Sequence, residues 1–155
     1  MTGPYRYTYC RTLPDGGPQW LWVLLNPQTR DHIHAGPVLN RIEAATKTGR
    51  GGGFYVAHLY AWLTPTPEAL FMLPEYQRIG PLNDLALQQF AADARASKGK
   101  IVVAWGDHPK ARERGASVVK ALREVMPVHC LGLSRSRNPM HPLYVAGSTS
   151  VRPLP

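Results

Sequence analysis

The sequence predicts an α/β protein with a three-layer α/β/α sandwich, in which a central, mostly parallel four-stranded sheet is preceded by an N-terminal β-hairpin. Two observations predict this class. Short apolar runs typical of buried strands alternate with segments whose apolar residues recur at helical spacing. The length of 155 residues and the hydrophobic content of 44% suit a single domain, residues 1–155, around one core.

The first half of the chain is expected to form a hairpin, a strand, a helix and a second strand. Residues 5–9 alternate aromatic and polar side chains, PDGG at 14–17 signals a turn, and the apolar run QWLWVLL follows. Residues 38–48 have apolar side chains at helical spacing, and the Gly-rich residues 49–53 are interpreted as a connector. FYVAHLY at 54–60 predicts the next strand.

The second half is expected to continue the alternation of helices and strands. Thr66 and Pro67 indicate the start of a short helix, and a longer helix is predicted from Pro81 to near Gly99. A β-branched strand at 101–105, a helix at 113–126 and a strand at 128–133 follow. The remaining residues, 134–155, are polar, rich in proline and expected to be irregular.

The net charge of +8 favours a polyanionic partner. Eight of the 18 basic residues lie within residues 101–155, which hold three acidic residues. We expect DNA as the partner, single- or double-stranded, although a solubilising surface is the alternative. The apolar runs are too short for a membrane span, the N-terminus lacks a secretory pattern, and Cys10 and Cys130 are expected to be reduced core residues. A cytoplasmic monomer is the expected state.

Functional residues are expected where the strands end, because open parallel sheets bind ligands beyond the carboxyl ends of their strands. The four segments concerned are 26–29, 58–62, 106–109 and the stretch after 133 that includes 140–144. Asn26 is the most conspicuous residue among them. It ends the most apolar run of the chain, and Pro27 restricts the backbone immediately after it.

Several short motifs in this order resemble the domain-of-unknown-function family 1643. They are LLNPQT, a strand ending HLYAW, then VVAWG, and VHCLGL followed by NPMHPLY. The resemblance extends from about residue 5 to about residue 151. The family name itself supplies no activity.

A more distant resemblance is to the uracil-DNA glycosylase superfamily, whose parallel sheet also lies between helices. Asn26–Pro27 is similar to its first motif, in the version of the thymine and mismatch glycosylases, and His141–Pro142 is similar to the start of its second. The resemblance implies hydrolysis of the N-glycosidic bond of a damaged or modified base that has left the DNA stack. Asn26 would orient the water, and His141 would donate a hydrogen bond to the departing base.

The same resemblance and the strand-end rule nominate further residues. Base or substrate contacts are expected from Pro27, Gln28, Thr29, His58, Tyr60 and Gly106. DNA contacts are expected from Arg135 and Arg137 on phosphates and from Leu143 or Tyr144 as a wedge into the duplex. No cofactor is expected, and the histidines show no zinc-ligand spacing, so no metal is expected either.

Two departures from the superfamily pattern leave alternatives open. Leu24 stands where the superfamily has glycine, and His58 stands where an asparagine often reads the base. The chain could therefore be an inactive nucleic-acid-binding module on the same fold, or an enzyme acting on a free nucleoside or nucleotide. Asn26, His58 and His141 could also be purely structural residues: a cap, a buried histidine and a loop histidine packed on Pro142.

Overall fold

The chain folds into a mixed α/β structure around a six-stranded sheet with the order β1-β3-β2-β4-β5-β6. The computed structural model describes residues 4–28 and 36–155. The strands are β1 (Tyr9–Thr12), β2 (Gln19–Leu24), β3 (Gly53–His58), β4 (Ile101–Val103), β5 (Val128–Cys130) and β6 (Arg152–Pro153). Neighbouring strands from β3 through β2 and β4 to β5 pair in parallel, whereas β1 and β6 pair antiparallel at the two edges.

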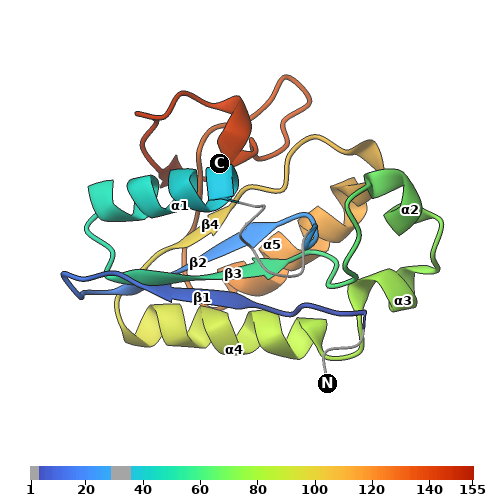
Figure 1. The fold of residues 1–155 in the computed structure, drawn as a ribbon, viewed down its shortest axis with the longest axis horizontal. Helices are drawn as coiled ribbons and strands as arrows, with labels where there is room; N and C mark the ends of the chain where they lie inside the picture. Colours follow the sequence, from blue (N-terminus) through green and yellow to red (C-terminus); the bar gives the residue numbers. More distant parts are fainter. Residues whose placement is uncertain (1–3, 29–35) are drawn as a thin grey trace.

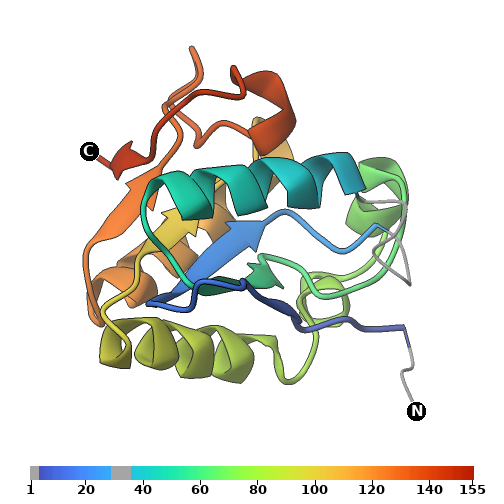
Figure 2. The ribbon, with the colours of Figure 1, turned by 60° about the vertical axis from the view of Figure 1, so that its left-hand side comes forward.

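Helices lie on both faces of the sheet. Helix α1 (Gly36–Thr48) covers one face, and helices α4 (Asn83–Ala96) and α5 (Arg112–Arg123) cover the other (Figure 1). The short helices α2 (Pro67–Phe71) and α3 (Glu75–Ile79) and the 3-10 helix η1 (Pro109–Ala111) lie beyond one end of the strands. A further 3-10 helix, η2 (Pro142–Tyr144), packs beside α1 (Figure 2).

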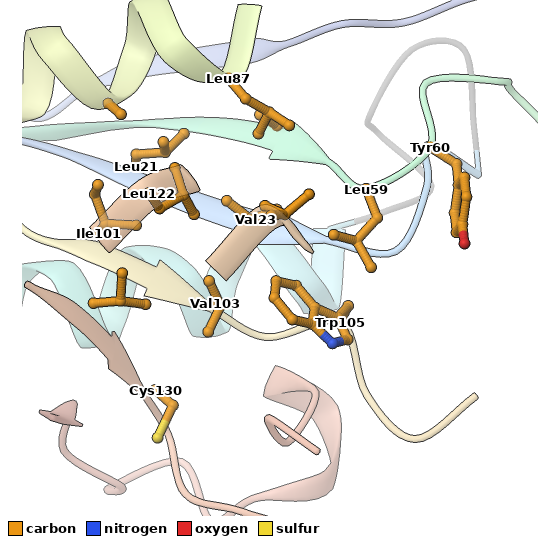
Figure 3. Packing of buried hydrophobic residues seen from close by; sticks show 14 of the residues in the cluster. Leu21, Val23, Leu59, Tyr60, Leu87, Ile101, Val103, Trp105, Leu122 and Cys130 are labelled. Carbon is orange, nitrogen blue, oxygen red and sulfur yellow. The ribbon is translucent and has the colours of Figure 1, made fainter. Parts of the chain in front are cut away.

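Strand β2 supplies the centre of the core on both faces, because its successive side chains point in opposite directions. Trp20 and Trp22 pack in the cluster on the α1 side, and the indole N–H of Trp22 donates to Thr46 Oγ1 of α1 at 3.0 Å. Leu21 and Val23 pack in the cluster on the α4 and α5 side, which Figure 3 shows with Trp105 beyond the end of β4. Both sets are at most 1% exposed, so β2 is buried on both faces, as parallel sheets require.

The predicted N-terminal hairpin is wrong. Strands β1 and β2 do not pair with each other, because β3 lies between them and pairs with both. The turn predicted at 14–17 does form, with Gly16 N–H donating to Leu13 O at 3.2 Å, but it crosses the start of β3. Gly52 permits this crossing, since a Cβ there would lie 2.1 Å from the backbone nitrogen of Gly17.

Three further expectations need correction. The C-terminal tail is not wholly irregular: Arg152–Pro153 forms β6, and Leu154 N–H donates to Val128 O at 2.9 Å. The first strand lies at Tyr9–Thr12 rather than at residues 5–9. Cys130 is buried as expected, whereas Cys10 is exposed on the edge strand β1. No helix in the described residues is long and apolar enough to cross a membrane.

Candidate functional site

Eight of the residues nominated from the sequence line one cavity, which we call the site cavity. It has a volume of about 320 Å³ and lies where β2, β3 and β4 end. The nominated residues that line it are Asn26, Pro27, Gln28, His58, Gly106, His141, Leu143 and Tyr144. The carboxyl ends of neighbouring parallel strands therefore bring these residues together, as the strand-end rule predicts.

The carboxamide of Asn26 is held in one orientation by carbonyl groups of the loop after β3. Its Nδ2 donates to Thr64 O and to Pro27 O, both at 3.0 Å, and approaches Trp62 O at 3.4 Å. Because these partners are all acceptors, the amide nitrogen Nδ2 must face them, and the oxygen Oδ1 points to the opposite side. Oδ1 is buried and accepts no hydrogen bond from any described residue. Asn26 is 6% exposed, so this acceptor can be satisfied only within the molecule or by something that enters the cavity.

His141 presents a defined hydrogen-bonding pattern at the start of η2. Its Nδ1 accepts the backbone N–H of Leu143 at 3.2 Å, so the neutral ring carries its proton on Nε2. Burial lowers the pKa of His141 from its ordinary value of 6.5, which favours this neutral form at neutral pH. The side chain therefore offers one N–H donor and no positive charge.

Arg41 of α1 fixes the segment that carries His141. Its Nη1 donates to Val145 O at 2.7 Å and to Pro142 O at 3.3 Å. These bonds tie both ends of η2 to helix α1, which covers the sheet face next to it (Figure 2). Hydrogen bonds from a charged guanidinium group to backbone carbonyls are stronger than those between neutral groups. They therefore stabilise the position of η2, which is only three residues long.

The loops after β4 and β5 are joined next to the cavity. Gly106 N–H donates to Pro139 O at 2.9 Å, and Asp107 Oδ1 accepts from Asn138 Nδ2 at 2.6 Å and from Ser134 Oγ at 2.8 Å. These two bonds, with Arg112 nearby, lower the pKa of Asp107. Gly106 has φ +86, and a Cβ there would lie 3.5 Å from Cβ of His141. Gly106 thus adopts a backbone conformation that residues with a side chain rarely adopt.

His58 ends β3 and is 3% exposed, and two polar side chains hold the backbone around it. Asn83 Nδ2 donates to the carbonyls of His58 and Leu59 at 2.9 and 3.1 Å. Arg114 Nε also donates to Leu59 O at 3.0 Å, while its Nη2 contacts Asp84 Oδ1 at 2.7 Å. Helices α4 and α5 therefore fix the end of β3, and with it the imidazole that lines the cavity.

His108, which belongs to the strand-end segment 106–109, also lines the site cavity. Its Nδ1 accepts the backbone N–H of Lys110 at 3.2 Å, and its ring stacks on Phe71 at 4.4 Å between centroids. Burial and the charge of Lys110 lower its pKa, against a weaker opposing effect of Glu68. The repeated His-Pro dipeptide after a strand, at 108–109 and again at 141–142, was the signal that could have revealed it.

Three of the nominated residues that the structure describes do not line the site cavity. Tyr60 is wrong as a base-stacking residue, because it is fully buried and its ring packs edge-on against Phe71 at 5.3 Å. Arg137 lines a different cavity, and Arg135 is exposed on the same loop. Thr29 lies outside the described residues.

The exposed rim of the site cavity is formed by η2. Leu143 is 42% exposed and Tyr144 is 78% exposed, and both line the cavity. The ring of Tyr144 lies 5.7 Å from that of His141. Two exposed apolar side chains at a cavity mouth are suited to contact a partner. No group of three or more His, Cys, Asp or Glu residues that could hold a metal occurs in the described part of the chain.

A family model described as "Protein of unknown function (DUF1643)" matches residues 6–143. The match covers every element from β1 to the middle of η2, and therefore nearly all residues of the site cavity. No curated protein and no solved structure matches the chain.

Proposed function

The chain belongs to the DUF1643 family, whose description names no activity, and we propose that it is a DNA glycosylase-like enzyme that hydrolyses the N-glycosidic bond of a flipped base. One observation carries the proposal: an oriented carboxamide and a neutral imidazole line the same small cavity at the strand ends. The parallel strands between helices and the Asn-Pro and His-Pro motifs support a sandwich of the uracil-DNA glycosylase type. The target base is a damaged or modified one.

The site cavity suits a single ring rather than a larger ligand. Its volume of about 320 Å³ is at the lower end of the range for small-molecule sites. A base inside duplex DNA cannot reach such a cavity, so the nucleotide must leave the stack. Leu143 and Tyr144 at the mouth are placed to fill the space that the base vacates.

Asn26 would hold the attacking water through its free Oδ1. The opposite side of the carboxamide is bound to Thr64 O and Pro27 O, so Oδ1 cannot exchange places with the amino group without losing both bonds. A carboxamide accepts a hydrogen bond but does not take up a proton at neutral pH. Asn26 would therefore position the water, and the cleavage would depend on how well the leaving base is stabilised.

His141 would stabilise the leaving base. As the N-glycosidic bond breaks, the electron pair moves to the base, and its carbonyl oxygen becomes anionic. The Nε2–H of a neutral imidazole can donate to that oxygen, and the tautomer is set by the bond from Leu143 N–H to Nδ1. Removing one donor of this kind from an enzyme costs about 10²- to 10³-fold in rate.

A nucleic-acid-binding module without catalysis is the second candidate, and Leu24 favours it. The side chain of Leu24 is 8% exposed and lines the site cavity, at the position where the superfamily has glycine. It occupies space beside Asn26 that a closely approaching ligand would need. Base release from DNA distinguishes the two candidates, because binding alone leaves every glycosidic bond intact.

The test is a panel of oligonucleotides that each carry one deaminated, alkylated or hypermodified base. We expect the purified protein to create an alkali-labile site in at least one of them. Asn26→Ala and His141→Asn should abolish it while the thermal unfolding curve stays cooperative. Full-length oligonucleotides after alkali treatment across the whole panel, with DNA binding intact, would favour the binding module instead.

A further inference from the structure

A second cavity, which we call the basic cavity, lies between α5, the loop 133–139 and the end of the chain. Its volume of about 470 Å³ exceeds that of the site cavity. Four basic residues line it: Arg112, Lys120, Arg123 and Arg137. No Asp or Glu side chain is among the described residues that form its wall.

Within the described residues, no Asp or Glu forms an ion pair with any of these four cations. Arg112 donates to Ser136 O, and Arg123 donates to Leu154 O and Pro155 O at 2.9 and 3.0 Å. The acceptors Ser136 O and Leu154 O are uncharged backbone carbonyls, so the bonds to them do not neutralise a guanidinium charge. Across the residues that the structure describes, the ion pairs are Arg11 and Lys47 with Glu43, Arg78 with Glu75, and Arg114 with Asp84.

Asp107 is the acidic group whose pKa responds to Arg112, but it does not compensate the cavity. Its Oδ1 is already engaged by Asn138 Nδ2 and Ser134 Oγ. It belongs to the site cavity rather than to the basic cavity. Like charges around a partly enclosed space repel one another, and a bound anion removes that repulsion.

Trp105 adds an unused hydrogen-bond donor to the wall. The residue is 5% exposed, and its indole N–H donates to no other described residue. Gly115 of α5 faces this edge of the indole, since a Cβ there would lie 3.0 Å from Nε1. Both residues line the basic cavity, so the indole forms part of its wall.

Trp105 also connects the basic cavity to the site cavity, because it lines both. A third cavity shares Arg112 with the basic cavity, and its other charged lining residues are Arg78, Lys110 and Glu113. Lys110 lies two residues after His108, which lines the site cavity. Positive side chains therefore continue from the basic cavity towards the loop that borders the site cavity.

We infer that the basic cavity binds phosphate groups of a single nucleic-acid strand, which continues from the nucleotide whose base occupies the site cavity. The polymer identity of the ligand rests on the proposed function, whereas the anionic character rests on the cavity itself. Lys120 and Arg137 would contact phosphate oxygens, and Trp105 Nε1–H would donate to one of them. Enclosure between α5 and the loop 133–139 favours one strand over a duplex.

The test compares two matched double variants by binding to a fluorescent single-stranded DNA of unmodified bases over a range of salt. Lys120→Gln with Arg137→Gln removes two charges from the basic cavity. Arg95→Gln with Lys98→Gln removes two charges elsewhere. Each pair combines a cation in the last turn of a helix, α5 or α4, with a loop cation of positive φ. The two pairs therefore carry similar costs in folding, which thermal unfolding will confirm.

The inference predicts that only the cavity pair weakens binding, by about tenfold at low salt. The slope of log affinity against log salt should become shallower by about 1.4, since each phosphate contact on a single strand contributes about 0.7. The inference would be overturned if both double variants weakened DNA binding equally, or if neither weakened it.

This outcome is separable from that of the proposed function. The probe contains no target base, so its affinity does not depend on bond cleavage. If the two double variants bound DNA equally while base release by the wild-type protein was observed, only the inference about the basic cavity would be rejected. A preserved difference without base release on any substrate would reject the glycosylase proposal alone.

Discussion

His108 and His141 make the same local arrangement in the loops that follow the neighbouring strands β4 and β5. Each precedes a proline that begins a 3-10 helix, and each Nδ1 accepts the backbone N–H two residues later at 3.2 Å. Each ring is therefore fixed in the tautomer that carries its proton on Nε2. Both line the site cavity, and burial is the main cause that lowers the pKa of both.

Replacing each of these histidines by asparagine separates their roles. Asparagine keeps an acceptor for the N–H two residues later but cannot place a donor at the position of Nε2. We expect His141→Asn to lower the rate of base release at least about 100-fold. His108→Asn should lower the rate of base release about tenfold, because this substitution removes one contact between the cavity wall and the base. Single-turnover kinetics with saturating enzyme measure both, and a larger effect at position 108 would reverse the assigned roles.

The folded protein is expected to lose stability as the pH falls below about 6.5. The pKa values of His108, His129 and His141 are lowered in the folded state, mainly by burial. The unfolded chain therefore binds protons at these positions before the folded one does, which favours unfolding as the pH decreases. Urea unfolding between pH 7.5 and pH 5 measures the trend. Stability that is unchanged or higher at pH 5 would contradict the directions of the three shifts.

Much of the fold follows from the local pattern of the sequence. The apolar run that becomes β2 is buried on both faces, and the other parallel strands of the sheet, β3, β4 and β5, are also short apolar segments. Short runs in which every residue is apolar predict strands of a parallel sheet, because such strands are buried on both faces. The strand-end rule pointed to the segments that contain Asn26, His58 and His141, and all three residues line the site cavity.

The errors arose where pairing depends on distant residues. PDGG is a good hairpin turn, yet β1 and β2 are separated because β3 inserts between them. The residue that permits this arrangement is Gly52, about 35 residues after the turn, because a Cβ there would collide with Gly16 and Gly17. Tyr60 shows the second kind of error: it follows β3 closely, but α2 and α3 cover it with Phe71 and Arg78. The hydrophobic periodicity within one segment does not reveal which strands will pair, or which helices will cover a given residue.

Arg41 is expected to stabilise η2 and thereby His141. Arg41→Met keeps the aliphatic stem but removes the bonds to Val145 O and Pro142 O. We expect a loss of about 1 to 2 kcal/mol in the free energy of unfolding. Hydrogen exchange of the Tyr144 amide, which donates to His141 O at 3.0 Å, should accelerate. Arg50→Met is the matched control, since Arg50 is exposed just after the same helix; equal effects would exclude a specific role.

Asn83 is expected to position His58 through the backbone. It is fully buried, and Asn83→Ala leaves the carbonyl of His58 without this donor, whereas Leu59 O keeps the donor from Arg114. The expected cost is about 1 to 3 kcal/mol of stability, with a changed NMR signal of the His58 ring. Asp84→Asn serves as the comparison, because that carboxyl side chain is 73% exposed and its loss should cost under about 1 kcal/mol. An unshifted His58 resonance in Asn83→Ala would exclude the positioning role.

The central claim is that Asn26 and His141 act together on one extruded base. Mass spectrometry of the intact oligonucleotide after incubation tests it most directly, because hydrolysis exchanges one base for a hydroxyl group and releases the free base. We expect this mass loss on a modified oligonucleotide with the wild-type protein, and a loss at least about 100-fold slower with His141→Asn at equal DNA occupancy. Unchanged masses with bound wild-type protein across the panel, or an undiminished loss with His141→Asn, would contradict it.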